Sequence, residues 1–146
     1  MEIILRILAS TIAATSAMTL FSYVLSWAVK KCFKEPALLE LVFESLLNIK
    51  NKIGKMLVAW IFHYSVGLFF ILAYELIWSR TSLDVDWQSG LLFGLACGII
   101  AIFAWSVLLQ IPKETPKVNR KQYYIQLLIA HFIFSFTAIA VHQLMR

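Results

Sequence analysis

The chain alternates between four long apolar stretches and short polar connectors. Its uncharged runs extend from Ile7 to Val29, Met56 to Tyr74, Trp87 to Pro112 and Gln122 to Met145. An α-helix needs about 20 residues to cross the hydrocarbon core of a bilayer, and each run is near or above that length. The pattern therefore predicts an all-α polytopic membrane protein. We expect a single domain over residues 1–146, a bundle of four transmembrane helices spanning about 4–29, 56–78, 88–111 and 122–145.

The connector between the first two spans carries a shorter helical pattern. Pro36 suits the first turn of a helix. The apolar residues that follow recur at helical spacing, namely Leu38, Leu39, Val42, Leu46 and Ile49. Glu40 and Glu44 fall on another face. We expect an amphipathic helix over about 36–49 that lies on the inner membrane face or caps the bundle.

Composition excludes a soluble protein and leaves no room for a soluble catalytic domain. The 146 residues are 61% hydrophobic and 14% charged, whereas a soluble domain has about 25% charged residues. The net charge of +5 lies in the connectors and forms no separate basic domain. We therefore expect membrane lipids with anionic headgroups as partners, and no nucleic acid. Cys32 and Cys97 show no metal-binding spacing, so we expect no structural metal.

The distribution of cationic residues predicts the orientation of the chain. Ten of the thirteen Lys and Arg residues lie in the first and third connectors: Lys30, Lys31, Lys34, Lys50, Lys52, Lys55, Lys113, Lys117, Arg120 and Lys121. The second connector holds only Arg80. Because cytoplasmic loops carry the Lys/Arg excess, we expect both termini on the outer, periplasmic side.

Glycines recur every four residues in the third span, at Gly90, Gly94 and Gly98. This spacing forms a groove in which a second helix backbone approaches closely. The second helix belongs either to the same chain or to another copy. Within the chain, the first span offers small residues at the same spacing, including Ala13 and Ala17, and a second stripe of Thr15, Thr19, Ser22 and Ser26.

Two histidines are expected at similar depth in different spans. His63 and His131 lie roughly 10 Å and 13 Å from the inner boundary at 1.5 Å per residue. Polar side chains in a membrane usually face the bundle interior. We therefore expect a polar interior that also includes Tyr74, Ser135 and His142, with Gly67 on the face of His63.

Three interpretations of these histidines remain open. In the first, each imidazole is hydrogen-bonded to a neighbouring helix, for example to Thr15 or Thr19. In the second, His63 and His131 hold a b-type heme or a metal between them. In the third, they belong to a relay for protons or small solutes.

Glu75 is expected near the outer end of the second span. It either reaches water or Arg80 at the interface, or contacts His142 in the fourth span.

The segment Ala59-Trp60-Ile61-Phe62-His63-Tyr64-Ser65-Val66-Gly67, followed by Tyr74, resembles the second span of a family of small, uncharacterised bacterial four-helix inner-membrane proteins. Gly90 and Gly94 and the run ending near Ala17-Met18-Thr19 resemble the same family. The resemblance implies the fold and a location in the bacterial cytoplasmic (inner) membrane, and singles out His63 and Gly67. It implies no activity.

Function is therefore left to three hypotheses. The leading one is a non-enzymatic accessory or scaffold subunit that binds another membrane protein, a second copy or lipid. The second is a heme- or metal-binding redox protein that uses His63 and His131. The third is a small transporter or lipid-binding protein with a polar cavity between the second and fourth spans. No catalytic motif is present in the sequence.

Overall fold

A computed structural model describes residues 1–112 and 118–145, and over these residues the chain forms five α-helices. They are α1 (Glu2–Val29), α2 (Glu35–Leu47), α3 (Lys52–Arg80), α4 (Trp87–Leu108) and α5 (Arg120–Leu144). The predicted all-α fold, with a short helix between the first two spans, is confirmed. Lys113 and Lys117, which contribute to the predicted orientation, lie outside the described residues.

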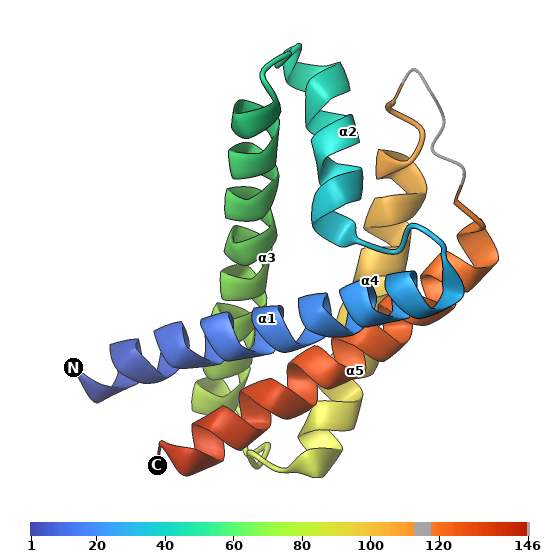
Figure 1. The fold of residues 1–146 in the computed structure, drawn as a ribbon. Coiled ribbons are helices and arrows are strands. Elements are labelled where there is room, and N and C mark those ends of the chain that lie inside the picture. The colour runs from blue at the N-terminus through green and yellow to red at the C-terminus, as the bar shows by residue number, and fades with distance from the viewer. Residues whose placement is uncertain (113–117, 146) are drawn as a thin grey trace.

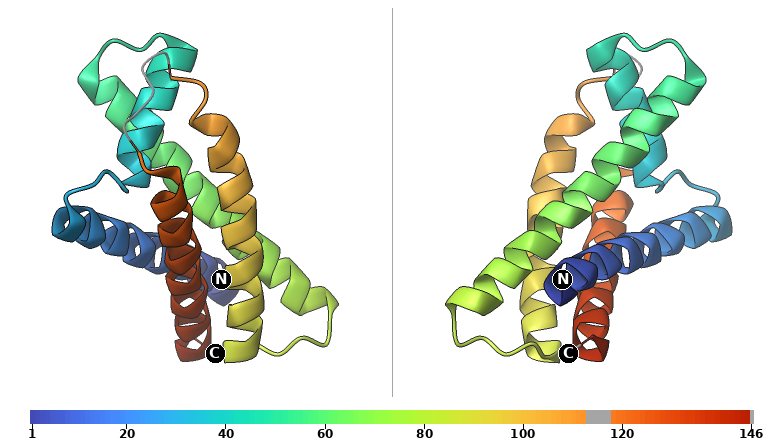
Figure 2. Two further views of the ribbon diagram at one scale, coloured as in Figure 1. Left: turned by 90° about the vertical axis from the view of Figure 1, so that its right-hand side faces the viewer. Right: turned by 90° about the vertical axis from the view of Figure 1, so that its left-hand side faces the viewer.

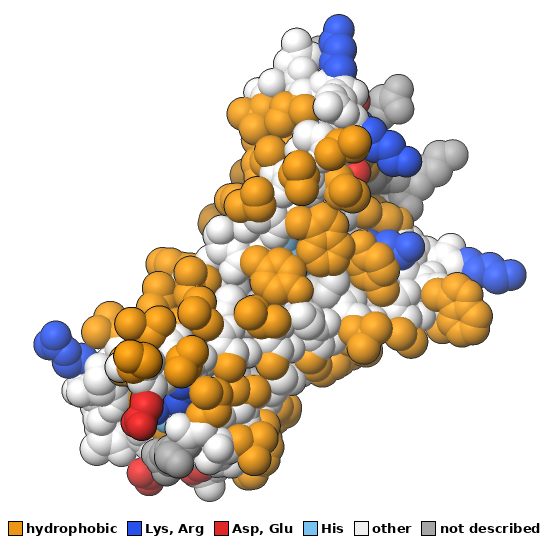
Figure 3. All heavy atoms as spheres, turned by 60° about the vertical axis from the view of Figure 1, so that its left-hand side comes forward, with side chains coloured by type: hydrophobic (Ala, Val, Ile, Leu, Met, Phe, Trp, Pro, Cys, Tyr) orange, Lys and Arg blue, Asp and Glu red, His pale blue; other side chains and the backbone are white. Residues whose placement is uncertain are grey.

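Within the described part of the chain, α1, α3, α4 and α5 are long and apolar enough to cross a membrane. The short helix α2 is not one of these. In the view of Figure 3, hydrophobic side chains cover the middle of the molecule, and Lys and Arg lie toward its ends. The chain is therefore a multi-pass membrane protein by helix length and hydropathy, while which end faces the cytoplasm stays a prediction.

Short polar residues begin three of the helices. The Asn51 side chain accepts a hydrogen bond from the Ile53 amide at the start of α3, and Asn119 accepts one from the Gln122 amide at the start of α5. Asp86 and Ser89 form a reciprocal capping box at the start of α4. These side chains accept hydrogen bonds from backbone amides that have no partner within the helix. Because the capping residues belong to the polar connectors, each of these helices begins where its connector ends.

The helices cross rather than forming a parallel bundle (Figures 1 and 2). Helix α5 packs against both α1 and α4, while α3 packs against α1 and α2. The Gln143 side chain donates a hydrogen bond to the Val85 carbonyl at 2.9 Å, so the end of α5 lies beside the α3–α4 loop. At the opposite end, Lys31 donates to Gln122, which brings the first connector to the start of α5. The first and third connectors therefore share one end of the molecule.

The glycine stripe of α4 is covered by α5. A Cβ atom added at Gly94 would lie 2.5 Å from Phe132 Cδ1 and 3.0 Å from Phe132 Cα. An added Cβ at Gly98 would meet Leu128 at 2.5 Å, and one at Gly90 would meet Ile139 at 2.7 Å. The stripe thus allows close helix contact inside this chain. Ala13 and Ala17 of α1 are only half-buried, and the buried face of α1 carries its Thr and Ser stripe instead.

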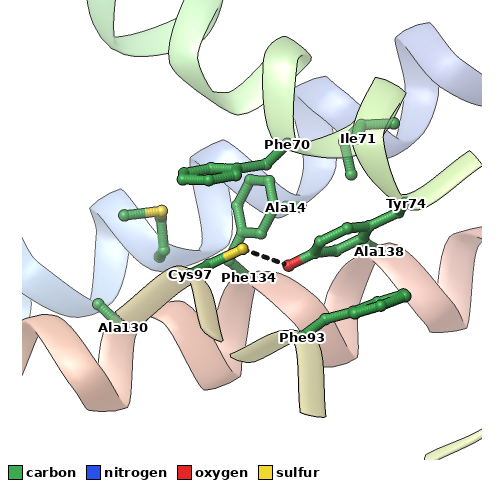
Figure 4. Close-up of a cluster of buried hydrophobic side chains, with 10 residues drawn as sticks. Ala14, Phe70, Ile71, Tyr74, Phe93, Cys97, Ala130, Phe134 and Ala138 are labelled. Carbon is green, nitrogen blue, oxygen red and sulfur yellow. Dashed lines mark hydrogen bonds between the residues drawn. The ribbon is translucent and has the colours of Figure 1, made fainter. Parts of the chain in front are cut away.

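One hydrophobic cluster joins the four long helices (Figure 4). The Tyr74 ring of α3 stacks on Phe93 of α4 with 4.3 Å between ring centroids. Phe134 of α5 packs edge-on against Phe70 and Tyr74 of α3. Aromatic pairs of this kind stabilise helix packing where lipid removes most of the hydrophobic driving force between helices.

We expect Gly94→Leu to lower the thermal stability of the purified protein. The new side chain overlaps the backbone of Phe132, and overpacking of this kind costs about 1–3 kcal/mol. Ala96→Leu is the matched control, since Ala96 is an exposed residue of the same helix. Thermal unfolding in mild detergent measures the effect. Equal melting temperatures for the two variants would refute close packing at Gly94.

Candidate functional site

A cavity of about 170 Å³ lies inside the helix bundle and is lined by residues of all five helices. Helices α3 and α4 supply most of its wall, and α5, α1 and α2 close it from the inner side. Both histidines of interest, His63 and His131, line this one cavity. The lining of this cavity is mainly apolar and includes residues of the second and fourth spans, between which the sequence predicts a polar cavity.

The rim of the cavity is apolar and exposed. Phe62 of α3 is 43% exposed and Ile100 of α4 is 54% exposed, and Val66 and Ala104 lie beside them on the same outer surface. These residues lie on the surface that faces lipid when the helices span a membrane. The cavity therefore opens sideways, between α3 and α4, toward the hydrocarbon.

The inner part of the cavity is buried and partly polar. His63 is 8% exposed and His131 5% exposed, and the side chains of Thr15 and Glu35 are buried almost completely. All four residues line the cavity. Since buried polar groups are costly unless hydrogen-bonded, the partners of each one decide what the cavity can bind.

The hydrogen bonds of His63 fix its tautomer. Its Nε2 lies 2.8 Å from Thr19 Oγ1, and the Thr19 hydroxyl donates its one proton to the Thr15 carbonyl at 2.6 Å. Thr19 Oγ1 therefore accepts from His63, so Nε2 carries the proton. In the neutral ring Nδ1 is then an acceptor, and no described residue donates to it.

The same reasoning applies to His131. Its Nδ1 lies 2.7 Å from the Leu127 carbonyl, which only accepts, so Nδ1 carries the proton. A buried imidazole without a counter-ion is neutral, because burial penalises its charged form. His131 Nε2 is thus an acceptor, and like His63 Nδ1 it has no donor among the described residues.

Thr15 carries a hydroxyl that has no hydrogen-bond partner among the described residues. Its Oγ1 points at Gly67, where an added Cβ atom would overlap it. Gly67, which the sequence singles out together with His63, thus leaves the space that the hydroxyl occupies. The Thr15 oxygen itself is buried against Gly67, at the contact between α1 and α3.

Glu35 lies at the α2 side of the cavity and belongs to a cluster of three polar residues. Its Oε1 accepts hydrogen bonds from Ser22 Oγ at 2.8 Å and from Gln126 Nε2 at 2.9 Å. Its Oε2 and the Oε1 atom of Gln126 are buried without partners among the described residues. The cluster joins α1, α2 and α5, so it holds the short helix against the bundle.

Burial raises the pKa of Glu35 from 4.5 to about 7, and the bonds from Gln126 and Ser22 offset only part of this effect. The carboxyl is therefore substantially protonated at neutral pH. A proton on Glu35 Oε2 makes that atom a donor. Protonation therefore lowers the cost of burying Glu35 Oε2 and Gln126 Oε1, which otherwise are both acceptors without a donor.

A heme does not fit this cavity. A space of about 150 Å³ holds a single six-membered aromatic ring, so 170 Å³ is far smaller than a four-pyrrole macrocycle requires. Among the described residues, no three His, Cys, Asp or Glu side chains are grouped to hold a metal ion.

Tyr74 and Ser135 form a separate polar contact deeper in the bundle. The Tyr74 hydroxyl lies 2.6 Å from Ser135 Oγ and 3.2 Å from Cys97 Sγ. All three residues are buried in the cluster of Figure 4 or against it. They connect α3, α4 and α5 and satisfy one another, so they leave no free group for chemistry.

A third polar cluster lies at the end of the molecule with the chain termini. Glu75 of α3 accepts two hydrogen bonds from Arg6 of α1, at 3.0 and 3.1 Å. His142 Nδ1 of α5 lies 3.0 Å from Glu75 Oε1, the oxygen that also accepts from Arg6 Nε. The sequence left two possibilities for Glu75, and the structure shows the one in which Glu75 contacts His142. Arg6 is the cationic partner, and the exposed Arg80 makes no ion pair with Glu75.

Sequence reasoning missed Glu35 and Gln126. Both could have been found from periodicity. Glu35 precedes Leu38, Leu39 and Val42 by three, four and seven residues, which places it on the apolar face of its helix. An acidic residue on an apolar face is an exception that signals a specific buried partner.

Neither protein-family models nor curated proteins nor solved structures match this chain. The resemblance of the second span to a bacterial membrane-protein family thus stays a prediction. The site is interpreted from its own geometry.

We expect the stability of the protein to fall as the pH rises from about 4.5 to about 7. The raised pKa of Glu35 means that the folded protein binds more protons than the unfolded chain in this interval. The slope due to this one group approaches about 1.4 kcal/mol per pH unit. Thermal unfolding in detergent at a series of pH values measures it. Glu35→Gln should remove this part of the slope, whereas Glu40→Gln on the same helix should leave it in place.

We expect Glu75→Ala to destabilise the protein by about 2 kcal/mol, because it removes hydrogen bonds from a partly buried cation. Glu44→Ala is the matched control. Its ion pair with Lys55 is exposed, and exposed pairs contribute less than about 1 kcal/mol. Chemical or thermal unfolding of both variants in the same detergent provides the comparison, and similar losses would show that the Arg6–Glu75–His142 cluster adds no stability.

Proposed function

We propose that this protein binds a membrane-soluble amphiphile within its helix bundle. The main support for this proposal is the shape of the cavity. Its mouth between α3 and α4 is apolar and exposed, and its base is buried and includes His63 and His131. A molecule that enters from the hydrocarbon must itself be soluble there. A molecule that reaches the base gains hydrogen bonds at His63 and His131, whose second ring nitrogens have no donor among the described residues. Only a compound with an apolar body and a polar end suits both parts.

This proposal favours the lipid-binding hypothesis over the two others. The glycine stripe that suggested a partner protein is covered by α5, so the accessory-subunit hypothesis has lost one of its two supports. Its other support is the cationic end of the chain, which includes Lys30, Lys31 and Lys34, and these residues fit anionic headgroups equally well. The heme hypothesis requires a larger cavity than the structure has.

We expect purified protein to retain about one amphiphile per chain, and Ala104→Trp to lose it. Ala104 lies at the mouth, and an indole there would close the route from the lipid. Native mass spectrometry from mild detergent, after expression in a native membrane, measures the bound mass. Ile99→Trp is the matched control, since Ile99 is exposed on the same helix and does not line the cavity.

The two variants separate binding in the cavity from lipid that adheres to the outer surface. Retention by wild type and Ile99→Trp together with loss in Ala104→Trp would support the proposal. Wild type without a bound molecule, or equal retention by all three proteins, would contradict it.

A further inference from the structure

The base of the cavity has more hydrogen-bond acceptors than the protein supplies donors for. His63 Nδ1 and His131 Nε2 are acceptors because the opposite nitrogen of each ring donates to Thr19 or to the Leu127 carbonyl. An occupant that brings hydroxyl protons would satisfy groups whose isolation is costly.

The dimensions and walls of the cavity indicate the shape of that occupant. Its 170 Å³ is close to the space of about 150 Å³ that holds one benzene ring. Phe70, Trp105 and Phe134 are buried in its wall and offer aromatic surfaces on which a flat ring can pack. The mouth between Ile100 and Phe62 leaves a path along which a tail can reach the lipid.

We propose that the occupant is a hydroquinone with an apolar tail, whose ring lies in the cavity and whose hydroxyls donate to His63 and His131. This inference rests on the proposed function, since it names the chemical class of the amphiphile. The tail extends through the mouth between α3 and α4.

Other membrane-soluble molecules fit the base less well. An acyl chain brings no donor for His63 Nδ1 and His131 Nε2. The oxidised form, a quinone, carries only acceptors, so its carbonyl oxygens would face the acceptor nitrogens of two neutral imidazoles. A cationic amine would require a buried charge with no ionised counter-ion while Glu35 is protonated. The hydroquinone alone among these brings both protons and an aromatic ring.

The test compares 2-decylhydroquinone with 2-decylquinone, which share ring and tail and differ only in the hydroxyl protons. Dissociation constants are measured by titration of the full-length protein in mild detergent without oxygen. We expect the hydroquinone to bind at least about tenfold more tightly, because the quinone leaves the acceptors unsatisfied. ¹⁵N NMR of the imidazoles gives a second readout. The unprotonated nitrogen of His131 should shift on addition of the hydroquinone and should not shift with the quinone.

Two variants identify the groups responsible. His63→Leu and His131→Leu should each reduce the preference for the hydroquinone while changing the dissociation constant of the quinone less than about threefold, because each removes an acceptor that the quinone does not use. If neither variant folds, the ¹⁵N shift of His131 in the wild-type protein carries the test. A preference that survives in every folded variant would overturn the assignment.

The outcomes also separate this inference from the proposed function. Equal binding of both probes, lost in Ala104→Trp, would overturn hydroxyl recognition and leave cavity binding intact. Absence of binding by either probe, with a different amphiphile retained in native mass spectrometry, would overturn the hydroquinone alone. Absence of any retained or added ligand would overturn both.

Discussion

The interior of this bundle is organised by the cost of a polar side chain in hydrocarbon. Water is scarce there, so each such group finds a partner in the protein or remains unsatisfied at considerable cost. Most of the polar residues inside the bundle meet this requirement across helices. Tyr74 pairs with Ser135, Glu75 with Arg6 and His142, and Ser22 with Glu35. The polar contacts therefore decide which helices are neighbours.

Several of the exceptions lie together at the cavity. Thr15 and Glu35 each keep an unpartnered atom, and His63 and His131 each keep a ring nitrogen without a donor among the described residues. All four residues line one space. Trp78, Tyr123 and Gln126 also keep a buried unpartnered atom and do not line the cavity, so it is the grouping of four such residues at one site that distinguishes the cavity. This also explains why Gly67 lies opposite Thr15, where any side chain would remove the free hydroxyl.

The fold was accessible from the sequence because it depends on local signals. Apolar length predicts the spans, and Asp86 and the two capping asparagines begin helices beside the polar connectors. The similar depth predicted for His63 and His131 agrees with their place in one cavity, because depth follows from helical rise alone. The pairing of helices was harder to predict. The glycine stripe of α4 predicts a close helix contact, and α1 offers small residues at the same spacing, but α5 covers the stripe; residue size does not specify a partner. The burial of Glu35 depends on Ser22 and Gln126, which lie far from it in sequence.

The sideways mouth of the cavity has a consequence for how occupancy is controlled. A molecule that arrives between Phe62 and Ile100 would diffuse within the plane of the bilayer and need not pass through bulk water. Its effective concentration would then be a mole fraction among lipids, which changes with membrane composition even when the amount per cell is constant. Dilution of the aqueous phase would leave saturation unaltered, whereas added lipid would lower it.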